Sequence, residues 1–346
     1  MDALFSKFKS FVQELVSPIF TFEMKKTAFY PKEDLIDLTL SIALMNCCAE
    51  GFAKTLRENK PAPTSETLLD YLKTANVDTI LNTAKVQIDK CVATLQKKGI
   101  RLNKAALAFD WHDQPYYGSH QTEGVVGTKP KDGTSYAYSY LTVSVITPKK
   151  RLVLAVLPLK TRGGLPQLVL ALLDFLMIQY IRNVAFDNGY QDSQILQALI
   201  ERNVPFVIPL RDTVKLQKRW RWLRYAKRFC YNTQGVDVDV VEAVDFKGVQ
   251  YFLATNLPLR PKRLLRLYKK RWGIETSYRM IGQFYPKMTS NSYVIRVFYF
   301  VLAVLLYNVW VLLNARVKES VIVIRLKLLC LWSLQSTPCK LADSLG

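Results

Sequence analysis

Three acidic residues lie where carboxylates could act together on a metal ion. Asp110 closes the apolar run 105–109, and Asp187 closes a second strand-like run, 181–186. Each run predicts a buried strand, and acids at the carboxyl ends of neighbouring strands meet where such sheets bind their substrates. Two carboxylates that close together repel each other unless a cation lies between them. The pattern therefore predicts a divalent-metal site held by Asp110 and Asp187.

The third acid, Glu275, stands in a stretch crowded with cations, Tyr-Lys-Lys-Arg-Trp-Gly-Ile-Glu over 268–275. Read as a helix, this stretch places Tyr268, Arg271 and Glu275 on one face at i, i+3 and i+7, and Arg279 continues the face. We expect Glu275 to supply the third metal ligand. The alternative is an exposed Arg271–Glu275 pair on a surface helix, which would contribute only a few tenths of a kcal/mol.

The metal class follows from the available ligands. The chain has only two histidines, and its six cysteines form no C-x2-C pair, which argues against a zinc site. Three carboxylates suit Mg²⁺ or Mn²⁺, the hard ions of phosphoryl transfer. Two such ions, about 3.5–4 Å apart, activate a water or a 3′-hydroxyl and stabilise the departing oxygen. The cysteines, with no signal peptide, also indicate a reduced, cytoplasmic protein.

Several of these residues have a second interpretation. Asp113 could be the ligand in place of Asp110, although we favour Asp110 because it ends the predicted strand. Asp187-Asn188-Gly189 has the composition of a tight turn, so Asp187 could simply cap that turn. Trp111, beside Asp110, could stack on a ring of a bound substrate, or it could be a core residue.

The charge balance predicts a polyanionic partner. The chain carries 48 Lys and Arg against 28 Asp and Glu, a net charge of +20. Such an excess fits nucleic acid or an anionic membrane surface. Half of the residues are apolar, which excludes a disordered chain.

One basic segment, residues 211–229, interleaves eight cations with aromatic residues. Cationic side chains neutralise phosphates, and aromatic rings stack on unpaired bases. We expect Arg219, Arg221 and Trp222 to contact DNA, together with Lys270 from the later stretch. The alternative is a solvated basic loop.

Hydrophobic patterning predicts an α/β protein with a helical N-terminal domain over residues 1–100, which would bind DNA or serve as a scaffold. From residue 101 to 320 we expect strands, first as an antiparallel meander and then alternating with helices, in a mixed sheet covered on both faces. A small β insertion would occupy about 211–258, and 321–346 would form a tail. The expected strands are 105–110, 136–147, 151–159, 181–187 and 204–210; the expected helices include 34–53, 165–180 and 191–203.

Residues 297–313 form 17 nearly uninterrupted apolar residues, at the lower limit for a membrane span. Arg296, Asn308 and Arg316 flank or interrupt this run, and the chain has no comparable second segment. A helix buried in the middle of an α/β domain has the same pattern, and we expect that structure here, with no membrane partner.

The motifs together resemble the DDE transposases of bacterial and archaeal insertion sequences. The resemblance is to the family-four type branch with archaeal-like members, whose last motif reads Y-x2-R-x3-E-x6-K. Tyr268, Arg271 and Glu275 match its first three positions. Asp187-Asn188-Gly189-Tyr190 resembles the second motif, and Asp110, in Phe-Asp-Trp-His-Asp-Gln-Pro-Tyr-Tyr-Gly, resembles the first. The resemblance runs from about residue 100 to 315, with the motifs in the family's order.

The resemblance implies an RNase H-like mixed sheet flanked by helices and a metal-dependent transposase. Asp110, Asp187 and Glu275 would be catalytic and would hold Mg²⁺ or Mn²⁺, two ions in all. Tyr268, Arg271 and Arg279 would contact double-stranded DNA at the terminal inverted repeats or in the target, with the protein acting as a homodimer at the nucleoid. An RNase H-like nuclease or resolvase, or a non-enzymatic basic protein, is the alternative.

The chain departs from the motif at one position. The lysine that ends the family motif falls on Gly282. Arg279 or Lys287 could replace its phosphate contact. If neither does, this copy of the enzyme is impaired.

Overall fold

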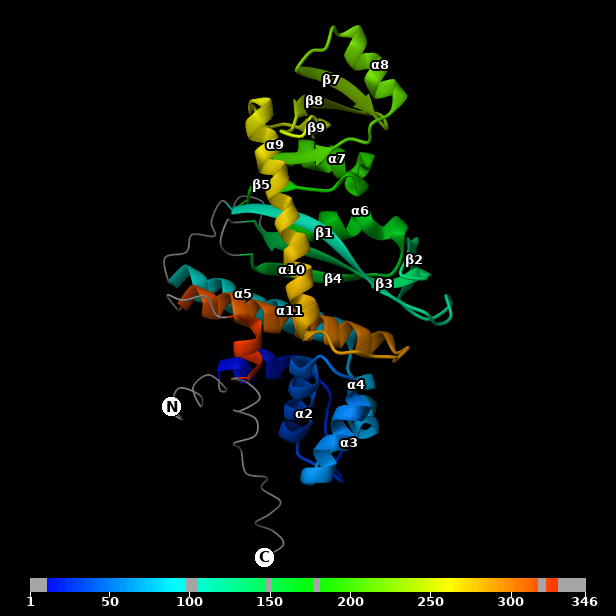
Figure 1. The fold of residues 1–346 in the computed structure, drawn as a ribbon, viewed down its shortest axis with the longest axis vertical. Coiled ribbons are helices and arrows are strands. Elements are labelled where there is room, and N and C mark those ends of the chain that lie inside the picture. Colours follow the sequence, from blue (N-terminus) through cyan, green and yellow to red (C-terminus); the bar gives the residue numbers. More distant parts are fainter. Residues whose placement is uncertain (1–10, 98–104, 147–150, 177–180, 317–321, 329–346) are drawn as a thin grey trace, which may run out of the picture. The chain divides into compact units, whose positions relative to one another are not determined.

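The computed structural model describes residues 11–97, 105–146, 151–176, 181–316 and 322–328 (Figure 1). The chain forms two compact units. One, here the helical unit, combines Met1–Lys98 with Tyr278–Gly346, and the other, here the sheet unit, is Gly99–Ser277. The second half of the helical unit includes the long apolar helix that we expected within the α/β domain.

A nine-stranded mixed sheet forms the sheet unit. Its strands are β1 (Ala105–Pro115), β2 (Val125–Lys131), β3 (Thr134–Val145), β4 (Val153–Leu159), β5 (Ile181–Ala185), β6 (Phe206–Pro209), β7 (Arg228–Thr233), β8 (Val236–Val244) and β9 (Gln250–Thr255). Their order is β2-β3-β1-β5-β6-β9-β8-β7, and β4 also pairs with β3. β5 is parallel to β1 and β6, and the other pairings are antiparallel. The predicted mixed sheet is confirmed.

The first strand is longer than its apolar run. β1 pairs with β3 from Leu107↔Val145 to Pro115↔Ala137, so Asp110 lies inside the strand, opposite Thr142. Our prediction that the strand ends at Asp110 is wrong, because the long β3 continues to pair with the polar half of β1. β2 was not predicted, because Gly127 and Pro130 break the alternation that indicates a strand.

The predicted β insertion belongs to the main sheet. β9 pairs with β6 through Val207↔Thr255 and Pro209↔Leu253, and β8 and β7 follow in turn. Gln234 and Gly235, both with positive φ, make the two-residue turn between β7 and β8. Such a turn matches the twist of the paired strands.

Helices pack against the strands of the sheet. α9 packs on β6, β8 and β9 and buries Leu264, Leu265 and Tyr268. α6 packs on β4, and α7 packs on α6 and β8. The helices of this unit are α6 (Leu165–Phe175), α7 (Ser193–Glu201), α8 (Val214–Trp222), α9 (Pro261–Lys269) and α10 (Gly273–Ile281), and the division between the units falls within α10.

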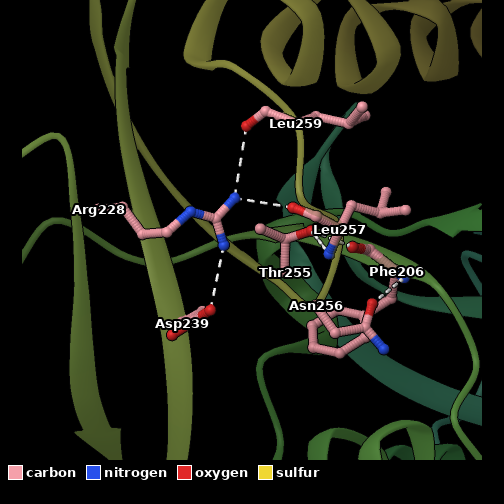
Figure 2. Close-up of polar contacts among 7 residues, drawn as sticks. All are labelled: Phe206, Arg228, Asp239, Thr255, Asn256, Leu257 and Leu259. Atoms are coloured by element: carbon pink, nitrogen blue, oxygen red, sulfur yellow. Dashed lines mark hydrogen bonds and ion pairs between the residues drawn. The ribbon is translucent and has the colours of Figure 1, made fainter.

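Polar contacts fix the segment that joins β9 to α9 (Figure 2). Arg228 on β7 donates to the carbonyls of Leu257 and Leu259, at 2.7 and 3.4 Å, and pairs with Asp239 at 3.1 Å. The Asn256 side chain accepts from the backbone N–H of Phe206 at 3.0 Å. The Thr255 hydroxyl donates to the Phe206 carbonyl and accepts from the backbone N–H of Leu257. These bonds hold the start of α9 on the sheet.

The helical unit packs around α11, which is almost wholly buried. α11 is long and apolar enough to span a membrane, with a mean hydropathy of 2.1, but 89% of its apolar window lies inside the protein. It packs against α5, and Phe298 packs edge-on against Phe20. The prediction of a buried helix is confirmed. The elements of this unit include η1 (Ser17–Ile19), α2 (Lys32–Met45), α3 (Ala49–Asn59), α4 (Ser65–Lys73), α5 (Val77–Lys97), η6 (Gly282–Phe284) and α11 (Tyr293–Arg316).

One helix predicted in this unit is divided into two helices in the structure. The expected helix 34–53 bends by 116° between α2 and α3. Asn46 ends α2 in the left-handed conformation (φ 54°), a conformation that asparagine tolerates better than most residues. Its side-chain amide donates to the carbonyls of Gly282 and Tyr285. This contact fixes the bend, and periodicity cannot reveal it.

Candidate active site

Two aspartates come together through the parallel pairing of β1 and β5. Ala108 pairs with Ala185 in that register. Asp110 and Asp187 each stand two residues further along, Asp110 within β1 and Asp187 just beyond the end of β5, so they follow this pair in register. Side chains two residues apart on a strand point to the same face. The sequence predicted this convergence for the right strands, although Asp110 is not at a strand end.

A buried arginine lies between the two carboxylates. Arg271 Nη1 is 3.2 Å from Asp110 Oδ2, and its Nη2 is 3.3 Å from Asp187 Oδ1. Arg271 is only 5% exposed. One guanidinium therefore spans both acids and supplies positive charge between a largely buried carboxylate, Asp110, and a more exposed one, Asp187.

The backbone around Arg271 is not one continuous α-helix. α9 ends at Lys269, a 3-10 turn spans Lys270–Trp272, and α10 begins at Gly273. The predicted single helical face is therefore wrong: Tyr268 and Arg271 are buried, whereas Glu275 is exposed. The 3-10 turn changes the angular spacing between α9 and α10, which removes the i, i+3, i+7 alignment.

Neighbouring contacts hold this turn in place. Lys269 Nζ lies 2.7 Å from Asp245 Oδ2, on the β8–β9 turn, and the Tyr268 ring packs on Tyr251. The Arg271 guanidinium lies over the Tyr268 ring, 5.9 Å from its centroid. At Gly273 a side chain would meet the guanidinium of Arg151 at 2.3 Å from its Nε, so only glycine fits without a shift.

The surroundings of Asp110 clearly shift the pKa of its carboxyl group. Burial raises the pKa of Asp110 from 3.8 to about 7, with further upward contributions from the charges of Asp187 and Glu275. Arg271 and the backbone N–H of Trp111 act in the opposite direction. The raised pKa means that the loss of hydration on burial, together with the neighbouring acids, outweighs the stabilisation that Arg271 gives to the ionised carboxylate.

Glu275 acts on Asp110 through its charge, but it does not join the aspartate pair. Among the described residues, no three acidic, His or Cys side chains are grouped closely enough to hold a metal ion. The donor chemistry nonetheless fits a hard cation, because Asp110 and Asp187 already share one positive group through oxygen atoms. Asp110 and Asp187 would hold the ion, and Glu275 would complete the set from α10.

Trp111 links the first two motifs. Its ring packs on Tyr190, with centroids 4.9 Å apart, and it fills the space beside Gly189. A Cβ at Gly189 would lie 2.4 Å from Trp111 Cη2. These contacts favour the core interpretation of Trp111 and explain why glycine stands after Asp187-Asn188.

The alternatives for the aspartates are also resolved in part. Asp187 is at the N-cap position of the 3-10 turn η4 (Asn188–Tyr190), but its side chain makes no capping hydrogen bond. Asp113 lies within β1, not in a turn, and accepts a hydrogen bond from Ser139. The pair that meets at Arg271 is therefore Asp110 with Asp187.

The residues predicted to contact DNA belong to different elements of the chain. Arg219, Arg221 and Trp222 are exposed on α8, and the Arg219 guanidinium stacks over the Trp222 ring at 4.7 Å. Lys270 is exposed in the 3-10 turn. Arg279 is also exposed but belongs to the helical unit.

Within the basic segment, one tryptophan is structural. Trp220 donates to the Ala226 carbonyl at 3.1 Å and packs edge-on against Phe252. Trp222, two residues later, is 71% exposed. α8 therefore packs one half-buried ring against the sheet and leaves the other ring among exposed cations.

Comparison with known proteins places these features in a family. Residues 102–309 match the transposase DDE domain. The fold is RNase H-like and similar to that of the piggyBac transposase in a synaptic complex with hairpin DNA, with a TM-score of 0.62 and 12% identity over 99% of this chain and 84% of that one. No curated protein matches the sequence. The match to the transposase DDE domain covers more than half of the chain, and the protein therefore belongs to the DDE transposase family.

Proposed function

We propose that this protein is the transposase of an insertion sequence, which cuts DNA at terminal inverted repeats and joins the ends to a target. One observation carries the proposal: two aspartates from neighbouring parallel strands converge on a single buried cationic group. The finer assignment to the Y-x2-R-x3-E branch rests on Tyr268, Arg271 and Glu275, three of the four positions of that motif.

Asp110, Asp187 and Glu275 are the proposed catalytic residues, with Mg²⁺ or Mn²⁺ held between them. Bound there, such ions stabilise the charge that develops on the phosphate and activate the attacking water or hydroxyl. The aspartates contribute the oxygens that orient this chemistry, and Asp110 must be ionised to do so. Glu275 is exposed on α10, and its charge already acts on Asp110, which supports its place in the proposed set.

Exposed cations provide the proposed DNA surface. Lys270 lies one residue from Arg271, so it would contact phosphate close to the reacting bond. Arg219 and Arg221 on α8 would neutralise phosphates further along the duplex, while Trp222 would stack on an unpaired base. Tyr268, which is buried, would act by supporting Arg271.

Assembly and location complete the proposal. Transposition joins two ends of one element, so we expect two copies of the chain to act together on paired ends, as a homodimer. The related structure is described as a synaptic complex. With DNA as the substrate, the protein would work at the nucleoid in the cytoplasm.

The test is DNA cleavage and joining with purified protein. Asp110→Asn, Asp187→Asn and Glu275→Gln should each abolish MgCl₂-dependent nicking of a duplex that carries the element's ends, while DNA binding persists. Asp174→Asn is the control, because Asp174 lies on the surface and pairs only with Arg202 among its described ion pairs. Undiminished nicking by the three site variants would refute the proposal.

Joining separates a transposase from a nuclease of the same fold. A labelled, pre-cut end should become covalently attached to a supercoiled target plasmid in the presence of wild-type protein. Cleavage without joining, at any end sequence, would instead support an RNase H-like nuclease or resolvase.

A further inference from the structure

Arg271 bonds the same two carboxylates that would hold the proposed metal ion. Its two terminal nitrogens reach one oxygen of Asp110 and one of Asp187. The second oxygen of Asp110 accepts the backbone N–H of Trp111 at 3.0 Å. Both oxygens of Asp110 therefore already accept a hydrogen bond, and a donor on each oxygen leaves this carboxylate fewer lone pairs for an ion.

Guanidinium and metal cannot share these oxygens at full strength. Mg²⁺ binds oxygen at about 2.0–2.1 Å and demands near-octahedral geometry. An arginine lying 3.2–3.3 Å from the same two oxygens fills the space between them and adds like charge beside the ion. The two cations are therefore competitors for Asp110 and Asp187.

The bonding of Arg271 is incomplete in this position. Its Nε is buried without a hydrogen-bond partner. An unsatisfied buried donor is unfavourable, so this position of Arg271 is less stable than a fully bonded one would be. The residue also lies on a 3-10 turn between two α-helices, and such a turn inside a helical stretch often marks a hinge. Its neighbours Lys270 and Trp272 are exposed, so solvent lies one residue away on either side.

We infer that Arg271 is a displaceable counter-ion, which holds Asp110 and Asp187 together in the metal-free protein and leaves them when a divalent ion binds. This inference rests on the proposed function, because it requires that the aspartates bind metal. Arg271 is a positioning residue in the metal-free state. Once released, its guanidinium is available to a DNA phosphate, so metal loading and substrate contact are coupled through one side chain.

The experiment is calorimetric titration of MgCl₂ and MnCl₂ into the full-length protein without DNA. Arg271→Gln removes the competing charge and should tighten metal binding about tenfold or more, in the range of ordinary coupling between sites. Arg271→Lys keeps the charge and should bind metal close to wild-type strength. Arg266→Gln is the matched control, because it removes an exposed positive charge from the same segment and should leave the affinity unchanged.

The metal affinities of wild type and the variants distinguish failure of this inference from failure of the proposed function. Equal or weaker metal binding by Arg271→Gln overturns the inference while leaving the metal site intact. If neither wild type nor any variant binds metal, the proposed function fails first. Circular dichroism will show whether Arg271→Gln folds. If it does not, the readout is the NMR resonance of the Arg271 Nε–H in the wild-type protein. This resonance is assigned by its absence from the spectrum of Arg271→Lys. That resonance should shift on MgCl₂ addition, and an unchanged resonance at saturating metal overturns the inference.

Discussion

The indole of Trp111 and the backbone of Gly189 are in direct contact, so tightly that a methyl group on Gly189 would lie 2.4 Å from Trp111 Cη2. Trp111 follows Asp110, and Gly189 is two residues after Asp187. The contact therefore joins the segments that carry the two aspartates and sets the separation between them.

Gly189→Ala should test this packing. We expect a loss of about 1–3 kcal/mol in the free energy of unfolding, because the methyl must push the indole or the backbone aside. Urea unfolding measures the effect. Gly163→Ala is the control, since a Cβ there meets nothing within 4 Å. Equal stability of the two variants would show that Trp111 moves away freely.

The raised pKa of Asp110 should be visible in the pH dependence of the protein's stability. Its folded pKa, about 7, is above its ordinary value of 3.8, so its contribution to stability is full below about pH 4 and is lost as pH rises through 7. The stability of wild type relative to Asp110→Asn should fall by about 4 kcal/mol between pH 4 and 8, at about 1.4 kcal/mol per pKa unit. Urea unfolding in EDTA measures it; a difference that is flat or rises with pH contradicts the assignment.

Two tryptophans of the basic segment should behave in opposite ways. Trp220→Ala removes a half-buried ring packed on Phe252 and should destabilise the protein by about 1–3 kcal/mol. Trp222→Ala should change stability by less than about 0.5 kcal/mol but weaken binding to DNA with unpaired bases by about 1–3 kcal/mol. Thermal unfolding and fluorescence anisotropy with hairpin DNA separate the two effects. Unchanged DNA affinity of Trp222→Ala would remove α8 from the proposed DNA surface.

Restoring the missing lysine should be structurally harmless. A Cβ at Gly282 meets nothing within 4 Å, so Gly282→Lys should keep stability within about 0.5 kcal/mol of wild type. If a lysine here reaches phosphate, the salt dependence of DNA binding should steepen by about one unit of slope. Gly282→Gln adds similar size without charge and serves as the control. Equal salt slopes for the two variants would show that position 282 does not contact the DNA backbone.

The sequence by itself determined which strands carry the acids. The apolar runs before Asp110 and Asp187 predicted two buried strands, and both form, as β1 and β5. It also predicted the buried helix α11, because charged and polar residues flank or interrupt its apolar run. Such predictions succeed because burial and periodicity are local properties of the chain.

Only the tertiary structure decided how the site is held together. Arg271 meets Asp110 across 161 residues of sequence, whereas the sequence predicted that Arg271 contacts DNA, with an exposed Arg271–Glu275 pair as the alternative. The length of β1 depended on β3, and the 3-10 turn that buries Arg271 depended on contacts with β8 and β9. Pairing energies and packing between distant segments set these features, and local pattern does not contain them. The acids were visible in the sequence, whereas their buried counter-ion appeared only in the fold.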